Sequence, residues 1–412
     1  MRSSLLGNNI ISVKEHNRQV VLLSLLYEEK LSRSELAKLT HLSNTTITNL
    51  ISELLEEGLV AESDCNDEEL TGVRPVGRPR TAICLVPDAQ FVIGVHVGVG
   101  TYRVALANLY DEIIHSCIEQ FDTQAQPEDV LEAMVFCVNQ VVEESGIDPA
   151  LILGVGVGLS GLVDFESGVN VMAPNLNWRN VPVKDLLANK LQMPVVVDNN
   201  VRCMALGETY FGVGVDLESL VFVYGRIGVG AGFISRGEVF RGSNMGAGEI
   251  GHTTLLGEEG EPCRCGKRGC LETLVSEPAI ISQAKAILKI EPKGILADII
   301  QQHPDDDVVN SIFAAARAGD ETVRSMLAKK AYYLGVALAN MVNLYNPELI
   351  LLGGLFAQEQ EFFIDPVIDT VRQMSFGGLG NQVRIEATSF GWKAGVVGAA
   401  ALALTQFFYL NP

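Results

Sequence analysis

The chain has 412 residues, of which 48% are hydrophobic and 19% are charged, and its formal net charge is −20. This length allows two or three domains with buried cores. The acidic balance argues against a general polyanion binder, so any nucleic-acid contact must come from a local basic surface. No apolar run is long enough to span a membrane, and Met1–Gln19 lacks the apolar core of a signal peptide. We therefore expect a cytoplasmic protein without a membrane partner.

A helical pattern of apolar residues over 17–27 opens the chain, and a shorter one follows it. Ser32 or Ser34 can cap this second helix, which is expected to end near Thr40. The residues expected to face inward from it are Leu36, Ala37 and Leu39.

The third helical pattern begins after Ser43, which can cap it, and Gly58 can end it. Its apolar stripe is Ile47, Leu50, Ile51, Leu54 and Leu55. With the preceding helix it forms a helix-turn-helix pattern, and short polar side chains near its N-terminus suit base edges and phosphates in a major groove. The alternative for this segment alone is a small helical bundle used for protein contacts.

Residues 59–62 and 82–85 are expected to form the two strands of a wing. Between them, the run Arg74–Arg80 holds arginines in an extended Gly-Arg-Pro context, which suits a narrow minor groove. A solvated linker is the other interpretation of this run. We predict a winged helix-turn-helix over residues 1–84. Its expected DNA contacts are Arg33, Lys38, Asn44, Thr45, Thr46, Thr48, Asn49, Arg78 and Arg80.

The proposed DNA-binding segment is not basic overall. Residues 1–90 contain 9 Lys plus Arg against 13 Asp plus Glu. Few phosphate contacts give weak nonspecific binding, so useful affinity needs more than one copy of the domain. We expect a homodimer, or a dimer of dimers, on operator DNA with two half-sites.

The pattern changes after residue 90 to strands and crossovers. Strands are expected first at 91–97, 102–109, 112–120, 151–159 and 194–197, and helices at 127–144 and 201–211. A related order then recurs with strands at 220–224, 230–235 and 349–352 and a long helix near 326–345. The repetition predicts two related α/β halves around a cleft.

Four potential metal ligands lie within a short stretch: His252, Cys263, Cys265 and Cys270. Three cysteines and one histidine complete a tetrahedral set for Zn²⁺ with no position left for water, which is typical of a structural site. Gly266 and Gly269 permit the sharp turn that this geometry needs. The alternative is three buried thiols beside an unrelated histidine. With eight cysteines in all, three of them in this pattern, we expect a reducing compartment rather than a disulfide framework.

The run from Ala247 to His252, followed by Cys-x-Cys-Gly-x-x-Gly-Cys-Leu-Glu at 263–272, resembles the signature of the ROK family of repressors, open reading frames and kinases. The resemblance implies an actin-like, ribonuclease-H-like fold, a zinc ion on the His and three Cys, and a sugar held by the two motif glutamates and the same histidine. The expected sugar-binding residues are Gly161, Asn175, Asn199, Asn200, Glu249, His252 and Glu272.

The chain differs from the kinases of that family in its phosphate-binding loops and at the position of the general base. His96 stands where the kinases carry the aspartate that organises Mg²⁺, and Arg226 stands where they carry threonine. Asn200 stands at the position of the general base, and an amide cannot accept a proton near neutral pH. The alternative is that Asp198 takes over as base.

The loop 173–178 resembles the family's Pro-Asn-Leu-x-Trp segment. Trp178 can stack on a sugar face and Asn175 can bind a hydroxyl, or the loop can simply be packed with a capping Asn. We divide the large domain into one lobe of residues 85–200 plus 390–412 and another of 201–389, which carries the zinc site and a dimerisation surface.

We therefore expect a sugar-responsive transcriptional repressor that binds a monosaccharide without phosphorylating it, and so is not an enzyme. One alternative is an ATP-dependent sugar kinase with an accessory DNA-binding domain. Another is a regulator controlled by contact with a transporter component, without a sugar.

Overall fold

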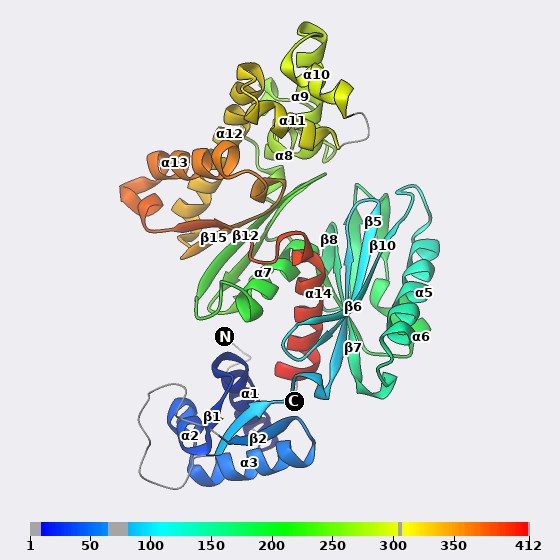
Figure 1. Cartoon of the computed structure of the whole chain (residues 1–412), viewed down its shortest axis with the longest axis vertical. Helices are drawn as coiled ribbons and strands as arrows, with labels where there is room; N and C mark the ends of the chain where they lie inside the picture. The colour runs from blue at the N-terminus through cyan, green and yellow to red at the C-terminus, as the bar shows by residue number, and fades with distance from the viewer. Residues whose placement is uncertain (1–9, 65–80, 304–306, 411–412) are drawn as a thin grey trace.

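The computed structural model describes residues 10–64, 81–303 and 307–410. Three bodies are visible in Figure 1: a small N-terminal domain and two larger lobes, each built on its own five-stranded sheet. Arg78 and Arg80, two of the expected DNA contacts, lie outside the described residues. Among the residues that are described, no helix combines the length and apolar character needed to cross a membrane.

The N-terminal domain is a winged helix-turn-helix. Its elements are α1 (Ile10–Glu28), β1 (Leu31–Ser32), α2 (Arg33–Thr40), α3 (Asn44–Glu56), β2 (Val60–Asp64) and β3 (Thr81–Leu85). The short strand β1 joins the wing, giving the order β1-β3-β2. Ser32, rather than Ser34, caps α2 in a reciprocal capping box with Glu35. Ser43 caps α3 by accepting from the Thr46 N–H at 3.1 Å.

One core residue of this domain was wrongly predicted. Leu39 is 51% exposed, whereas Leu36 is buried. The helix α2 has only eight residues, so a single turn faces the core, and Leu39 lies on the turn that leads into His41. His41 adopts the left-handed conformation (φ 56°) that ends the helix.

The first lobe contains β4 (Phe91–Val97), β5 (Thr101–Asn108), β6 (Ile113–Gln120), α5 (Pro127–Ser145), β7 (Ile152–Leu159), α6 (Val183–Leu191) and β11 (Val195–Asn199). Its sheet has the order β11-β7-β4-β5-β6, with the first three strands parallel and the last three antiparallel. A separate sheet of β8 (Leu162–Asp164), β9 (Val169–Ala173) and β10 (Trp178–Val181) lies beside it.

The second lobe repeats this plan with the order β14-β13-β12-β15-β16. Its strands are β12 (Ser219–Gly225), β13 (Val229–Ser235), β14 (Glu238–Val239), β15 (Leu349–Gly354) and β16 (Arg384–Ala387). Its helices are α8 (Leu271–Val275), α9 (Glu277–Ile290), α10 (Ile295–Gln302), α11 (Val308–Arg317), α12 (Glu321–Tyr345) and α13 (Asp365–Met374). Strands β12, β15 and β16 are parallel, and β13 is antiparallel to β12, as expected for a related half.

Two helices lie between the lobes: α7 (Asn200–Phe211) and α14 (Ala394–Leu404) (Figure 1). Helix α14 packs on β4 and β7 of the first lobe, and α7 packs on β12 and β13 of the second. They cross at Gly207 and Gly398, where a side chain on Gly207 would come within 3.1 Å of the Gly398 Cα. The predicted boundaries at 84/85, 200/201 and 389/390 remain predictions.

The N-terminal domain shares a hydrophobic core with the end of α14. This core joins Leu22, Leu25 and Ile51 to Leu404 and Tyr409, among others. The Tyr409 hydroxyl donates to the Leu109 carbonyl at 2.6 Å, and the Gln19 amide donates to the Leu410 carbonyl at 2.9 Å. The domain is therefore packed against the first lobe.

One disulfide was not anticipated. Cys117 of β6 is bonded to Cys137 of α5, which packs over β5 and β6. Three of the other cysteines form the predicted cluster, and Cys84 and Cys203 are free thiols.

Candidate functional site

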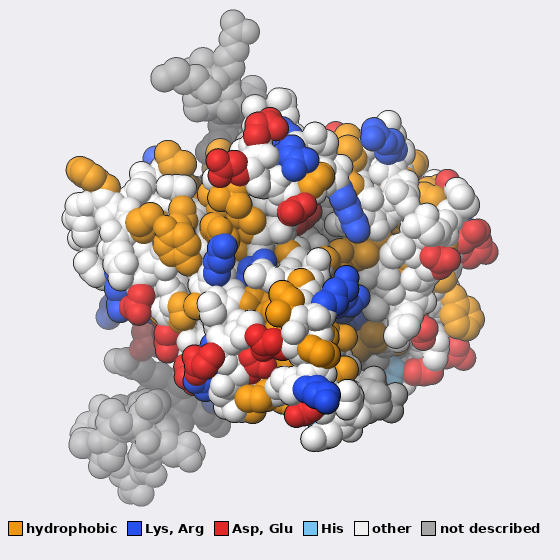
Figure 2. All heavy atoms as spheres, turned by 90° about the horizontal axis from the view of Figure 1, so that it is seen from above, with side chains coloured by type: hydrophobic (Ala, Val, Ile, Leu, Met, Phe, Trp, Pro, Cys, Tyr) orange, Lys and Arg blue, Asp and Glu red, His pale blue; other side chains and the backbone are white. Residues whose placement is uncertain are grey.

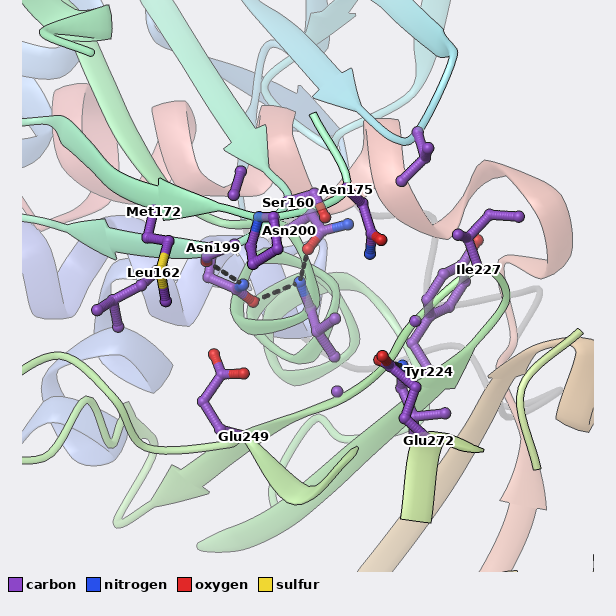
Figure 3. Close-up of a pocket in the computed structure, with 18 of the residues that line it drawn as sticks. Ser160, Leu162, Met172, Asn175, Asn199, Asn200, Tyr224, Ile227, Glu249 and Glu272 are labelled. Atoms are coloured by element: carbon purple, nitrogen blue, oxygen red, sulfur yellow. Dashed lines mark hydrogen bonds between the residues drawn. The ribbon is translucent and has the colours of Figure 1, made fainter. Parts of the chain in front are cut away.

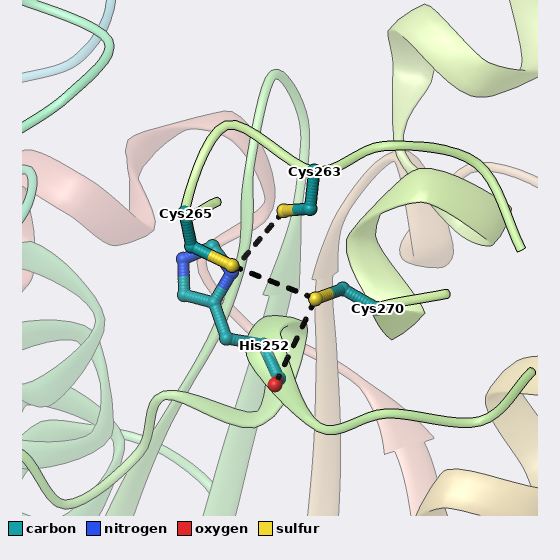
Figure 4. Close-up of side chains that lie close together, drawn as sticks. All are labelled: His252, Cys263, Cys265 and Cys270. Carbon is teal, nitrogen blue, oxygen red and sulfur yellow. Dashed lines mark hydrogen bonds between the residues drawn. The ribbon is translucent and has the colours of Figure 1, made fainter. Parts of the chain in front are cut away.

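The four predicted metal ligands come together (Figure 4). Their donor atoms all lie within 4.8 Å of one another. His252 Nδ1 is 3.6 Å from Cys263 Sγ, and Cys265 Sγ is 3.6 Å from Cys270 Sγ. Zn–S bonds of about 2.3 Å in a tetrahedron place two sulfurs roughly 3.8 Å apart, so these edges fit a bound ion. The cluster can hold a metal ion, as the sequence predicted.

The turn that carries the cysteines depends on its glycines. The Cys263 N–H donates to the Lys267 carbonyl at 2.7 Å, and the Gly266 N–H donates back to Cys263 at 3.0 Å. Gly266 and Gly269 both have positive φ, and a Cβ on Gly269 would lie 2.6 Å from the Gly257 backbone. Glycine is therefore required for this loop to fold close enough for four ligands to meet.

A pocket of about 590 Å³ lies between the lobes, beside the metal cluster. It is lined by every residue predicted to bind sugar: Gly161, Asn175, Asn199, Asn200, Glu249, His252 and Glu272. Figure 3 shows Glu249 on one side of the pocket, facing Asn199 and Asn200 on the other. Because Nδ1 of His252 lies in the metal cluster, Nε2 is the ring nitrogen left for a ligand in this pocket.

The two motif glutamates have different surroundings. Glu272 accepts a hydrogen bond from the Val229 N–H at 3.1 Å, which fixes its carboxylate. Within the described chain, the Glu249 carboxylate has no hydrogen-bond donor. Glu249 is accessible from the pocket, yet the protein around it excludes enough water to raise its pKa. An accessible acceptor without a donor is suited to a ligand hydroxyl.

Asn199 and Asn200 lie where β11 ends and α7 begins. Asn199 caps α7 by accepting from the Val201 N–H at 2.9 Å, and its amide donates to the Gly161 carbonyl at 2.9 Å. Its side chain is thus largely occupied within the protein. Gly161 has φ +99°, and any Cβ there would lie 2.4 Å from the Met172 carbonyl. Asn199 and Gly161 therefore shape the pocket wall, while Asn200 is the amide at the expected base position.

Asp198 does not line the pocket. It is 1% exposed, accepts from Arg241 Nε at 2.8 Å and lies 3.2 Å from Arg202 Nε. In β11 its side chain points to the opposite face from that of Asn199, although its carboxylate accepts from the Asn199 N–H at 2.7 Å. Because Asp198 is paired with Arg241 and lies outside the pocket lining, the alternative that it replaces the base finds no support in this geometry.

Two other predictions at the pocket need revision or refinement. Trp178 lines the pocket but is only 2% exposed and belongs to the first lobe's core, which favours the alternative of a packed loop over stacking on a sugar. Asn175 does line the pocket, and the Arg264 guanidinium donates to its side-chain oxygen. Arg264 lies between the cysteine ligands Cys263 and Cys265, and no sequence pattern singled it out.

His96, at the position of the kinase aspartate, lines the pocket and is 5% exposed. Burial, aided by the charges of Arg103 and Arg226, lowers its pKa to about 3, so the ring is neutral. It packs against Gly395 of α14, where a Cβ would meet the ring at 2.6 Å. A neutral imidazole has neither the charge nor the oxygen donors that Mg²⁺ prefers.

The expected DNA-contact residues of α3 form an outward face. Asn44, Thr45, Thr48 and Asn49 are exposed, and Thr46 is half-buried because its hydroxyl lies 2.9 Å from that of Ser43. Lys38 on α2 is also exposed. On α3, the exposed residues lie in the N-terminal half of the second helix of the helix-turn-helix.

Three acids of this domain are paired with its own cations. Glu53 is bonded to Lys14 at 2.9 Å, and Glu57 is bonded to Arg18 at 2.8 Å. Arg33, an expected DNA contact, is bonded to Glu62 at 2.8 Å. Part of the negative charge near α3 is therefore neutralised within the domain, and Arg33 is held by Glu62.

Comparison with known proteins identifies the family. A family model described as "ROK family" matches residues 92–406 of the chain. The chain belongs to the ROK family. It is 31% identical to the xylose repressor of Caldicellulosiruptor bescii, over 97% of this chain and 98% of that one. Its fold is thus an N-terminal winged helix-turn-helix followed by an actin-like, two-lobed α/β domain.

Two further relatives separate the repressor type of this family from the kinase type. The crystal structure of a ROK family transcriptional regulator, a homologue of the Escherichia coli Mlc protein, superposes with a TM-score of 0.81 at 26% identity, covering 97% of this chain and 98% of that one. A glucokinase of Halalkalibacterium halodurans is 30% identical, but its match covers 96% of the kinase and only 77% of this chain. The kinase is therefore shorter than this protein and similar in length to the two-lobed domain.

Proposed function

We propose that this protein is a cytoplasmic, sugar-responsive transcriptional repressor that binds operator DNA through its winged helix. Two observations support the assignment. A winged helix-turn-helix with an exposed polar recognition face is joined to a lobed domain with a ligand pocket. The relatives that match over nearly the whole chain are a repressor and a transcriptional regulator.

The ligand is a monosaccharide that is bound without being phosphorylated. The observation that carries this part is the amide of Asn200 at the base position, with the neighbouring Asp198 withdrawn into ion pairs with Arg202 and Arg241. Loss of a general base costs about 10²- to 10⁴-fold in rate. Glu249, Glu272 and Nε2 of His252 are the groups that would hold sugar hydroxyls, with Asn175 and Asn200 beside them.

The metal is zinc, one per chain, with a structural role. Three thiolates and an imidazole nitrogen favour Zn²⁺ over the harder cations, and four protein ligands leave no open position for catalysis. The ion would fix the loop that holds His252 and bring Glu249 and Glu272 to the pocket, since both flank the ligand set in sequence.

The helices α7 and α14 would carry the signal from sugar to DNA. Both begin at the pocket, α7 with Asn200 and α14 with Gly395 against His96. The far end of α14 belongs to the core shared with the winged helix. A sugar that favours one arrangement of the lobes would shift this packing and the spacing of two DNA-binding domains in a homodimer, or in a dimer of dimers.

The test uses full-length protein and an operator selected from randomised duplex DNA. Titration with free monosaccharides should change operator affinity, and the same preparation with ATP, Mg²⁺ and the bound sugar should release no ADP above background. Sugar-dependent ADP release at ordinary kinase rates would contradict the assignment. So would selection that enriches no sequence.

A further inference from the structure

Glu249 faces the amides of Asn199 and Asn200 across the pocket, although the two sides belong to different lobes (Figure 3). The two asparagines come directly after Asp198, where β11 of the first lobe ends. Glu249 ends a loop that follows β14 in the second lobe, and Arg241 lies near the start of this loop. The width of the pocket at this point therefore depends on what joins the loop to the end of β11.

Arg241 makes that connection. Its Nε donates to Oδ2 of Asp198 at 2.8 Å, and its Nη2 lies 2.8 Å from the same oxygen. The other carboxylate oxygen, Oδ1, accepts from the Asn199 N–H at 2.7 Å. The carboxylate of Asp198 thus joins a guanidinium group of the second lobe to the backbone of a residue in the pocket wall.

The Arg241 guanidinium also has an aromatic neighbour in the first lobe. It lies 3.8 Å from the ring centroid of Phe165, which follows β8. A guanidinium group that lies over a ring and is bonded to a carboxylate is held in one orientation. Within the described chain, no other side chain between residues 240 and 249 hydrogen-bonds to the first lobe.

The loop itself is compact. The Ala247 N–H donates to the Arg241 carbonyl at 3.2 Å, and the Ala231 N–H of β13 donates to the Gly248 carbonyl at 2.8 Å. A Cβ on Gly248 would lie 1.9 Å from the Ala231 carbonyl oxygen, so only glycine permits this approach. These bonds fix Glu249 within the second lobe, and Arg241 fixes this part of the second lobe against the first.

Burial makes the ion pair of Arg241 with Asp198 suited to this role. The two side chains are 23% and 1% exposed, so water competes little for the carboxylate. Nε of Arg202 also lies 3.2 Å from Asp198, but this nitrogen makes no hydrogen bond. Arg202 therefore supplies charge, whereas Arg241 supplies the directed bonds.

We propose that Arg241 is a positioning residue of the pocket, whose ion pair with Asp198 sets the separation between Glu249 and the wall formed by residues 199 and 200. The inference rests on the proposed sugar pocket and adds a residue that acts without touching the ligand, since Arg241 does not line the pocket. Hydrogen bonds need donor–acceptor distances of about 2.7–3.2 Å, so a ligand that bridges the two sides tolerates little change in their separation.

The first test is calorimetric titration of the full-length protein with xylose, glucose and N-acetylglucosamine. Arg241→Gln should weaken binding of the sugar that the wild type binds about 10-fold, the lower end of what hydrogen bonds to charged groups contribute. Arg241→Lys, which keeps the charge, should lose less. Arg236→Gln is the matched control, because this exposed arginine lies in the turn between β13 and β14 and has no ion pair among the described residues.

A double-mutant cycle separates positioning from a general loss of stability. Because Arg241 acts through Glu249, Arg241→Gln should cost less than about twofold in sugar affinity when Glu249 is already alanine. A full 10-fold loss in the Glu249→Ala background would overturn the proposal, since the effect would not pass through Glu249. Wild-type affinity in Arg241→Gln would also overturn it.

A measurement without ligand tests the same contact independently of what the pocket binds. Hydrogen exchange at the Ala247 amide, whose bond to the Arg241 carbonyl closes the loop, should be about 10-fold faster in Arg241→Gln and unchanged in Arg236→Gln. Asp198 keeps Arg202 as its counter-charge in the variant, which should therefore fold. Phe165→Leu, which keeps the ion pair and removes the ring, should change exchange in the same direction by a smaller factor.

The outcomes separate this proposal from the one on which it rests. Exchange at Ala247 that is unchanged in both Arg241→Gln and Phe165→Leu would overturn the positioning role and leave the sugar-responsive repressor intact. Faster exchange in a protein that binds no sugar would support the positioning role, and the proposed function alone would fail.

Discussion

The ligand pocket and the DNA-contact face of α3 are built in opposite ways. In the pocket, Glu272, Asn199 and His252 are held by backbone donors, a helix end or the metal cluster before any ligand arrives. On α3, Asn44 and Asn49 are exposed side chains. Over the face of the lobes seen from above, acidic and basic side chains are interspersed (Figure 2).

This difference predicts how each region responds to substitution. A group in the pocket is fixed by neighbours, so removing it leaves a partner unsatisfied and the loss is large and specific. An exposed polar residue on α3 gains its partners only on DNA, so each loss is smaller and salt-dependent. The following experiments test that ranking, from the largest expected effect to the smallest.

The largest loss of sugar affinity is expected when a ligand of the metal cluster is replaced. Cys270→Ser should abolish metal retention and reduce sugar affinity by roughly 100-fold or more, because the loop holding His252 and the flanking glutamates loses its anchor. Metal analysis should find about one zinc per chain in the wild type and none in the variant. Cys84→Ser is the control, since this free thiol lies on β3, outside the cluster. Zinc-free wild-type protein that still binds sugar would contradict the role given to the metal.

The next effect is expected from Glu249. Glu249→Ala should weaken sugar binding by roughly 1–3 kcal/mol, because a ligand hydroxyl would lose its acceptor.

Asn200→Asp should retain sugar binding and gain little or no kinase activity, since His96 and Arg226 still occupy the phosphate side. Calorimetry and ADP release measured on the same preparations check both statements. A large gain of turnover in Asn200→Asp would show that only the base separates this protein from a kinase.

A smaller effect is expected on the DNA face. Asn49→Ala should relax the preference at one or two base pairs of the selected operator by about 1 kcal/mol, the lower end of the range for a lost base contact. Binding to unrelated DNA should be unchanged, and so should sugar affinity, because Asn49 lies on α3 and the pocket lies between the lobes. Competition assays with single-base operator variants measure this. An unchanged preference at every position would show that Asn49 does not face the bases.

The features that sequence predicted well are contiguous in the chain. The metal ligands, the motif glutamates and the caps Ser32 and Ser43 are set by local spacing, and the structure brings each to its expected place. The sequence could not show that Asp198 is withdrawn by Arg241, because those residues are far apart in the chain and meet only through the fold. The sequence left both interpretations of Trp178 open, because it does not show which side of a loop faces the core.

The smallest effect is expected from the ion pair of Arg33 with Glu62. The two side chains are 33% and 44% exposed, so their bond adds little stability. It does hold Arg33 away from a DNA phosphate. Glu62→Gln should free it, raising affinity for nonspecific DNA about two- to threefold at low salt and steepening the salt dependence by about 0.9, the value for one added phosphate contact.

The control for this experiment is Glu56→Gln. Glu56 is exposed on α3 and has no ion-pair partner among the residues described, so its substitution removes the same charge without releasing a cation. A general reduction of negative charge should raise affinity equally in both variants, whereas release of Arg33 should change the salt slope only in Glu62→Gln. Equal slopes would show that Arg33 does not contact the phosphates, and would leave Lys38 as the remaining described cation in the predicted contact set.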